Sequence, residues 1–299
     1  KKLDDFKRFP FDEARFDSYA EGPVWNTIHL KGKTAASYEG YEVDMEIRLF
    51  NTTKRIDLAY SIVKKPIVDP EGIYIAFPFQ LDNGKLFFDV QGGVVEAGKD
   101  QIPGSSNDWN TVQHFSVLRN NEAQIIMGSP EIPLMQFGGI NTGRYKAGAL
   151  PETTHMYSWP MNNYWVTNFN PDQKGQHQWS YFLTSGSDVS NSEASRFGWG
   201  TRIPFLTRIL PGGGKGESVW QKSLISGWPE NVILVNAQPV EGEKAILDEA
   251  WWTTLLHPSF TLANYKGVFL GDSTESLKAG VLPYFVNSIV ITLPATIFP

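Results

Sequence analysis

Residues 41–49 alternate strictly between two kinds of side chain. The odd positions carry Tyr41, Val43, Met45, Ile47 and Leu49, and the even ones carry Glu42, Asp44, Glu46 and Arg48. A period of two is typical of a β-strand with one face on a core and the other in water. A polar turn at residues 51–54 leads into a second alternating run at 55–62. The two runs predict an antiparallel hairpin whose charged face is the outside of a sheet.

Other strand-length runs follow along the chain, separated by clusters of Gly and Pro. They predict strands at residues 24–30, 73–79, 85–90, 113–118, 123–127, 178–183, 231–236 and 288–293. Helical periodicity is rare: residues 11–19 favour a short helix, and residues 247–256 fit either a helix or a strand. Because a parallel sheet needs helices between its strands, we expect an all-β protein built as a large antiparallel sandwich or barrel.

The length of 299 residues suits one large β domain with or without a small one. Pro, Gly and acidic residues gather at 238–243. We therefore expect a main domain over residues 1–237, with a short N-terminal lead-in. Residues 238–299 would be a smaller C-terminal β unit or a continuation of the same sandwich.

Bulk properties also exclude several classes of function. The net charge of −6 and the lack of a basic tract argue against a nucleic-acid partner. No apolar run approaches the ~18 residues of a membrane span, and the charged first residues do not predict a signal peptide. The chain has no cysteine, so disulfides, thiolate nucleophiles and cysteine metal sites are excluded.

Candidate catalytic groups are few. The five histidines show no metal-ligand spacing, so no metal site is predicted. A loop-rich stretch at residues 92–110 carries Glu96 and Asp100, and His114 follows it. These three could act as acid and base, although solvated loop acids and a packed histidine are the simpler interpretation. A second loop-rich stretch covers residues 186–216.

Two clusters favour carbohydrate instead. Residues 100–109 combine hydrogen-bonding side chains, tight-turn residues and one Trp, and residues 157–169 hold five aromatic residues and three Asn. Aromatic rings stack on sugar C–H groups, and amides bond to hydroxyls. The candidate substrate-binding residues are Asp108, Trp109, Asn162, Asn163, Trp165 and Asn168. Core packing, or docking against another domain, would explain the same residues.

Four motifs in this region resemble, in order and spacing, motifs of the C-terminal β region of glycoside hydrolase family 38 and its bacterial relatives. They are IYIAFPF at 73–79, PGSSNDWNTVQ at 103–113, PEIPLMQFG at 130–138 and MNNYWVTNF at 161–169. The likeness extends over about residues 43–183. The last third of the chain departs from the family pattern.

This resemblance implies a large antiparallel β-supersandwich of the galactose-mutarotase-like kind. In such α-mannosidase-like enzymes a preceding barrel carries the nucleophilic Asp and the zinc ligands. This chain shows no barrel pattern, so we expect no cofactor here, and zinc would belong to the barrel. The expected role is a non-catalytic module that supports the barrel and contributes loops to the substrate rim. The expected partners are a carbohydrate and a catalytic barrel, the latter in the same polypeptide.

Two other functions stay open from the residues alone. One is a stand-alone carbohydrate-binding protein that uses the Trp and Asn cluster. The other is a sugar epimerase or polysaccharide lyase on the same fold, in which His114 would act with Glu96 or Asp100.

Overall fold

A computed structural model describes residues 7–91, 93–141, 150–165 and 170–203 of the chain, together with the backbone of three strands between residues 233 and 292. The chain divides into two units, the first covering residues 1–90 and 94–202. The paired strands described below are antiparallel, as the sequence predicts.

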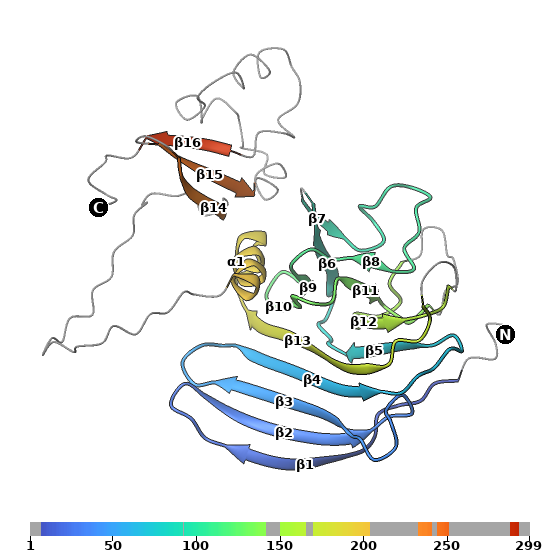
Figure 1. Ribbon diagram of the computed structural model, residues 1–299. Helices are drawn as coiled ribbons and strands as arrows, with labels where there is room; N and C mark the ends of the chain where they lie inside the picture. Colours follow the sequence, from blue (N-terminus) through green and yellow to red (C-terminus); the bar gives the residue numbers. More distant parts are fainter. Residues whose placement is uncertain are drawn as a thin grey trace, which may run out of the picture. The chain divides into compact units, whose positions relative to one another are not determined.

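Two sheets build the first unit (Figure 1). The larger sheet has nine strands, in the order β1 (Asp12–Ala20), β2 (Trp25–Lys33), β3 (Val43–Phe50), β4 (Ile56–Lys64), β13 (Gly175–Gly186), β10 (Gln124–Gly128), β9 (Ser116–Arg119), β6 (Lys85–Val90) and β7 (Gly93–Glu96). The smaller sheet has four strands, in the order β5 (Gly72–Phe77), β12 (Met156–Asn162), β11 (Leu134–Phe137) and β8 (Asn110–Thr111). The expected all-β architecture is confirmed.

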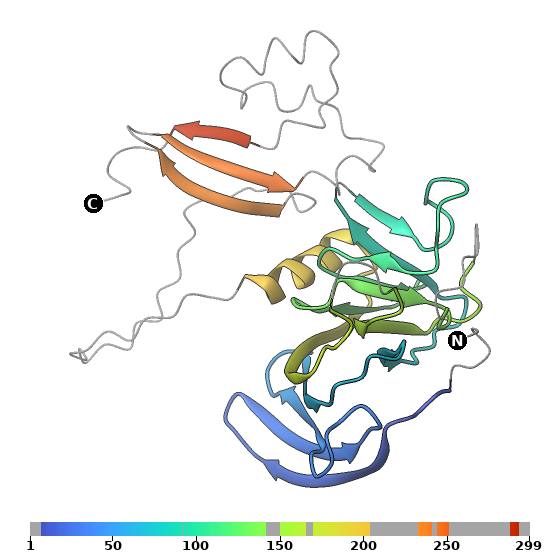
Figure 2. The ribbon, with the colours of Figure 1, turned by 45° about the vertical axis from the view of Figure 1, so that its right-hand side comes forward.

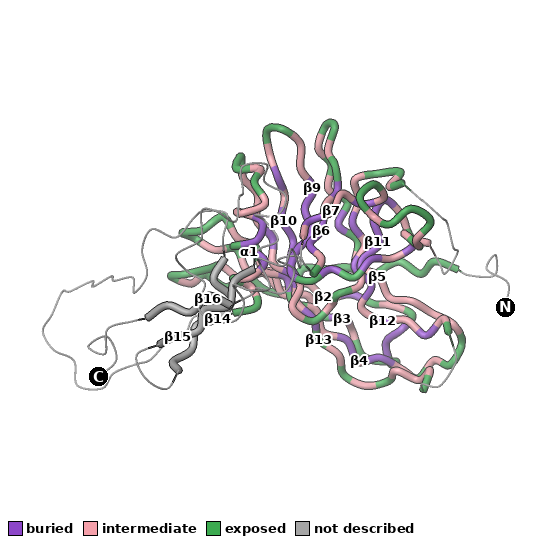
Figure 3. The backbone as a smooth tube through the Cα atoms, turned by 90° about the horizontal axis from the view of Figure 1, so that it is seen from above, coloured by how far each residue is buried: buried purple, intermediate pink, exposed green. Residues whose placement is uncertain are grey.

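The core lies where the two sheets face each other. The ring of Phe77 in β5 meets Tyr181 of β13 edge-on at 4.9 Å, and the Tyr181 hydroxyl donates to the Ser158 Oγ in β12 at 2.8 Å. Farther along, Phe88 of β6 stacks on Phe137 of β11 at 5.1 Å. Buried residues accordingly gather in β6, β9, β10 and β11 (Figure 3).

The predicted hairpin is the β3–β4 pair. Its register places Met45 opposite Tyr60 and Ile47 opposite Leu58. The apolar residues of both strands therefore share the core face, because directly paired residues point to the same side of a sheet. The charged side chains of β3 lie on the opposite face, where Glu46 pairs with Arg48.

The helix expected at residues 11–19 is wrong, because this segment is the edge strand β1. Pairing with β2 satisfies the backbone groups along one side of β1, and its charged residues Glu13, Arg15 and Asp17 form ion pairs with Lys33 and Lys31 of β2 and with Glu42, the residue before β3. These charges alternate with period two, a strand signal in the sequence. Two register shifts interrupt the pairing and hide the strand pattern of the apolar residues.

One helix was not expected: α1 (Asn191–Arg202) lies inside the stretch interpreted as loop-rich. Ser190 precedes it, and the Ser190 Oγ accepts a hydrogen bond from the Glu193 amide at 3.1 Å. This is an N-cap, and Ser-x-x-Glu is the sequence pattern of a capping box. The pattern could have revealed the helix.

The second unit contains a three-stranded antiparallel sheet of β14 (Ile233–Val240), β15 (Lys244–Ala250) and β16 (Ser288–Thr292). The ambiguous segment at 247–256 is strand as far as residue 250, and its remainder lies outside the described residues. The boundary expected near residue 238 stays a prediction. No helix in the described part of the chain is long and apolar enough to cross a membrane.

Candidate functional site

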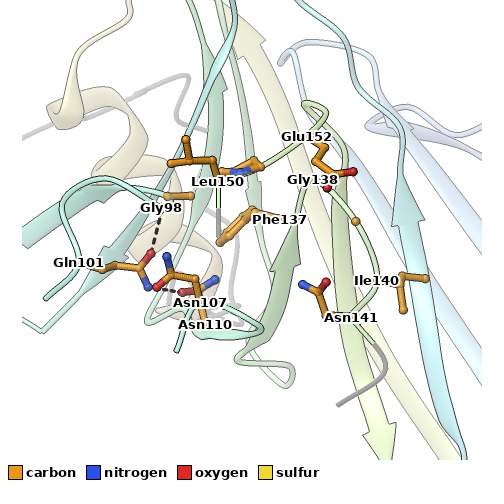
Figure 4. Close-up of a pocket in the computed structure, with 13 residues that line it drawn as sticks. Gly98, Gln101, Asn107, Asn110, Phe137, Gly138, Ile140, Asn141, Leu150 and Glu152 are labelled. Carbon is orange, nitrogen blue, oxygen red and sulfur yellow. Dashed lines mark hydrogen bonds between the residues drawn. The ribbon is translucent and has the colours of Figure 1, made fainter. Parts of the chain in front are cut away.

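A cavity of about 130 Å³ opens between the loop after β7 and the loop after β11 (Figure 4). Its lining consists of Ala97, Gly98, Gln101, Asn107, Asn110, Phe137, Gly138, Gly139, Ile140, Asn141, Leu150, Pro151 and Glu152. Cavities of about 150 Å³ hold a benzene ring. At about 130 Å³ the space is somewhat smaller than such a cavity, and its lining mixes amide, carboxylate and apolar groups.

Amide side chains shape one wall of the cavity. The Gln101 Oε1 accepts a hydrogen bond from the Gly98 amide at 2.9 Å, and the Gln101 Nε2 donates to the Asn110 Oδ1 at 2.7 Å (Figure 4). These bonds fix the loop after β7 to β8. Since the Asn110 oxygen accepts from Gln101, its amide nitrogen is the group left to bond to a ligand.

The opposite wall comes from the loop after β11. The backbone N–H of Asn141 donates to the Gln136 Oε1 at 2.7 Å, and the side-chain Nδ2 of Asn141 donates to the Asp108 carbonyl at 3.5 Å. Gly138 has a φ of +79°, and a Cβ at this position would lie 2.5 Å from the Pro151 Cα. Only glycine allows this close approach of backbone to backbone, so Gly138 is needed for the wall to close.

An aromatic cluster includes Trp109, the residue before Asn110 in the sequence. Trp109 lies 5.1 Å from Trp165 and 6.0 Å from Trp159, measured between ring centroids. Trp159 is buried and stacks on Tyr74 at 5.5 Å, whereas Trp165 is 41% exposed. Trp109 and Trp165 thus form the accessible end of a cluster whose other end belongs to the core.

The hydroxyls of Tyr74 and Tyr164 close the buried side of this cluster, 3.2 Å apart. Burial raises the pKa of Tyr74, and the hydrogen bond with Tyr164 raises it further. Burial likewise raises the pKa of Tyr164. Both phenols are therefore neutral at physiological pH. A Cβ on Gly72 would lie 2.6 Å from the Tyr164 hydroxyl, so the glycine makes room for the pair.

The two neighbouring Asn candidates have different surroundings. Asn163 is fully buried, its Oδ1 accepts from the Glu71 amide at 2.6 Å, and its Nδ2 lies within 3.1–3.2 Å of the carbonyls of Ile67, Asp69 and Pro171. These groups use its donor capacity, so the side chain ties the segment before β5 to the segment between β12 and β13. Asn162 is half-buried at the end of β12. Asn168 lies outside the described residues.

Asp108 is buried, and its carboxylate accepts a hydrogen bond from the Ser106 hydroxyl at 3.3 Å. It orders the loop beside the cavity without lining it. Asp100 is exposed, and its Oδ2 accepts from the Glu96 amide at 2.8 Å, which closes a turn. The Glu96 carboxylate lies 3.0 Å from the Lys99 Nζ and 3.7 Å from the Lys85 Nζ.

His114 is buried beneath helix α1. Its Nδ1 lies 2.7 Å from the Asp89 Oδ2, and its ring stacks on Trp199 of α1 at 4.0 Å. The second Asp89 oxygen accepts from the amides of His114 and Phe115. None of His114, Glu96 and Asp100 lines the cavity. A catalytic role for these three residues stays a prediction.

The described residues contain no group of three His, Asp or Glu side chains that could hold a metal ion. The cavity residues that sequence reasoning missed come from the end of β11 and the loop after it, above all Phe137, Asn141 and Glu152. The sequence did place a motif at 130–138, but it gives no sign that this loop lies against the loop after β7.

No protein-family model matches this sequence, and a comparison with curated proteins finds no match. Among solved structures, an α-mannosidase from Enterococcus faecalis V583 aligns with 79% of this chain at 10% identity and a TM-score of 0.53. A glycosyl hydrolase family 38 protein from Enterococcus faecalis aligns over the same share at 8% identity, again with a TM-score of 0.53. A putative aldose 1-epimerase from Escherichia coli reaches a TM-score of only 0.35.

These comparisons define the class of fold: an antiparallel β-sandwich like one region of the two Enterococcus proteins. The resemblance stated from the four sequence motifs is confirmed at this level. The chain spans 30% of the length of each of the two structures that it matches.

Proposed function

We propose that this chain is a non-catalytic β-sandwich module of a family 38-like glycosidase of the α-mannosidase type. In this role it supports a catalytic barrel and holds one sugar unit of the substrate at the rim of the active site. The observation that carries the proposal is the cavity lined in part by amide side chains, together with the exposed ring of Trp165, on a fold similar to part of an α-mannosidase.

The chemistry of the cavity supports a neutral sugar. The side-chain nitrogen of Asn110 can donate to a hydroxyl, the side-chain amide of Asn141 can donate and accept, and Phe137 offers an apolar ring. The exposed ring of Trp165 can stack on a second sugar unit. Contacts of this kind, few and partly solvated, suit weak binding with a Kd on the order of 1 mM, about −4 kcal/mol.

Titration calorimetry of the 299-residue chain with methyl α-D-mannoside and with an α-linked mannobiose tests the proposal. We expect millimolar binding that Asn141→Ala weakens at least about tenfold, equal to about 1.4 kcal/mol. Asn141 is the suitable position because, among the described residues, its side chain makes one hydrogen bond, and that bond is long at 3.5 Å. Gln178→Ala, an exposed amide on β13, is the matched control and should bind unchanged.

Turnover decides whether the module is non-catalytic. The isolated chain should neither hydrolyse p-nitrophenyl α-mannoside nor accelerate mutarotation. Turnover that disappears in His114→Gln, with the far-ultraviolet circular dichroism unchanged, would show an enzyme on this fold and overturn the proposal.

The exposed ring of Trp165 also fits a stand-alone carbohydrate-binding protein. The glycosidase module and the stand-alone binding protein predict different complete polypeptides. A polypeptide with a further barrel-like region supports the module, and one without it supports the binding protein.

A further inference from the structure

Rows of paired side chains cross the nine-stranded sheet from its edge to its core. In one row, Phe16 pairs with Leu30, Leu30 with Met45, Met45 with Tyr60 and Tyr60 with Trp179. In the next, Tyr19 pairs with Ile28, Ile28 with Ile47, Ile47 with Leu58 and Leu58 with Tyr181. Since paired residues point to the same side, all ten side chains lie on one face of the sheet.

Burial falls steadily along both rows. At the core end Trp179 is 4% and Tyr181 0% exposed, because the four-stranded sheet covers β13. At the edge Phe16 is 63% and Tyr19 49% exposed. The four-stranded sheet does not extend over β1 and β2 (Figure 1). Within the described part of the first unit, the outer part of an apolar face that is continuous with the core is therefore not covered.

The opposite face of the same strands is built for water. It carries ion pairs between Arg15 and Glu42, between Lys31 and Asp17, and between Arg48 and Glu46. An antiparallel sheet with one wet face normally packs its other face on a core. The face of β1–β3 that lacks charges has the composition of a buried surface, and contiguous exposed apolar patches of this kind mark interaction sites.

We propose that the apolar face of β1–β3, formed by Phe16, Tyr19, Ile28, Leu30, Met45 and Ile47, is the docking surface for another folded domain of the same enzyme. The identity of the occupant rests on the proposed function. The face continues the core interface between the two sheets, and the matched region makes up only 30% of each Enterococcus structure, so a fold of this kind has neighbouring domains to cover it. The edge strand itself is a poor partner for strand addition, because two register shifts distort β1.

The absence of cysteine from the chain makes a direct test available. Phe16→Cys places a thiol on the apolar face, and Ser18→Cys places one on the charged face of the same strand, where Ser18 pairs with His29. Each thiol is labelled with a maleimide in the 299-residue chain and in the complete polypeptide expressed from its gene. Mass spectrometry of the peptide that contains the introduced thiol gives the labelling rate.

We expect Phe16→Cys to react at least about tenfold more slowly in the complete polypeptide, because a docked thiol reacts only when the interface opens. Ser18→Cys should react at the same rate in both. Equal rates for Phe16→Cys, in a polypeptide that does contain a further folded domain, would overturn the docking surface and leave the proposed function standing.

Two other outcomes also count against the proposal. A complete polypeptide without a further folded domain overturns both the proposed function and the proposal that another domain docks on this face. If the Phe16→Cys thiol in the isolated chain is labelled more slowly as the protein concentration rises, the face binds a second copy of the chain. That result overturns the proposed occupant but not the proposed function.

Discussion

Two neighbouring asparagines show how burial separates residues that look alike in the sequence. Asn162 and Asn163 both belong to the motif at 161–169, and both are candidates for sugar binding. In the structure the Asn163 amide bonds to backbone groups of residues 67–71 and 171, whereas Asn162 is half-buried at the end of a strand. The first side chain organises loops, and only the second has a surface to offer.

Asn163→Ala should therefore lower the free energy of unfolding by about 3 kcal/mol, because it leaves several buried backbone groups without partners. Asn162→Ala, one residue away, should change it by less than about 0.5 kcal/mol. Urea unfolding followed by Trp fluorescence measures both. Similar losses in the two variants would contradict the structural role of Asn163.

Buried tyrosines predict how stability responds to alkaline pH. Burial raises the pKa of Tyr60 from 10.0 to about 12. Tyr60 is therefore neutral in the folded protein but ionises in the unfolded chain near pH 10. Its contribution to stability is complete below pH 10 and is lost as the pH rises through about 12.

Tyr60→Phe should reduce the loss of unfolding free energy between pH 9 and pH 12 by about 2 kcal/mol, since two pKa units correspond to roughly that amount. Urea unfolding at a series of pH values, with tyrosinate absorbance recorded in parallel, gives the measurement. A loss that is the same in both proteins would show that Tyr60 ionises freely in the folded state.

At the scale of the element, helix α1 depends on one close approach to the sheet. A Cβ on Gly198 would lie 2.8 Å from the Phe115 ring and 3.2 Å from the His114 Cβ, whereas a Cβ on Gly200 would meet nothing within 4 Å. Both glycines belong to α1. The helix thus provides a test and a matched control two residues apart.

Gly198→Ala should destabilise the protein by about 1–3 kcal/mol, because the added methyl group forces the helix away from His114 and Phe115. Gly200→Ala should stabilise it by up to about 1 kcal/mol, the difference in helix propensity between the two residues. Thermal unfolding of both variants tests whether the two substitutions change the stability in opposite directions. Stabilisation by Gly198→Ala would mean that α1 is not packed on this part of the sheet.

At the scale of the molecule, the open apolar face should be detectable in the isolated chain. The fluorescent dye ANS binds exposed apolar surface, so the native chain should bind it. Tyr19→Ser should weaken dye fluorescence severalfold with little change in stability, because the side chain is 49% exposed at the sheet edge.

Ile102→Ser is the control for this experiment. Ile102 is 80% exposed but stands alone in a loop away from the paired rows, so its replacement should leave dye binding unchanged. Equal effects of the two substitutions would mean that the dye does not report on the apolar face.

The sequence by itself determined the all-β architecture, because alternation with period two is a local property that each strand carries in its own residues. The β3–β4 hairpin follows from two such runs and a turn, and the motifs at 103–113 and 161–169 indicated the region that holds the aromatic cluster. The capping pattern before α1 is likewise a local property of the sequence.

Only the tertiary structure decided which of these residues can meet a ligand. The amide of Asn163 is used by groups up to 96 residues away in the chain, and the cavity forms where the loops after β7 and β11 meet. The edge position of β1 likewise depends on its pairing with β2 and on the extent of the second sheet. Such features arise from contacts between distant segments, which leave no periodic pattern in either segment alone.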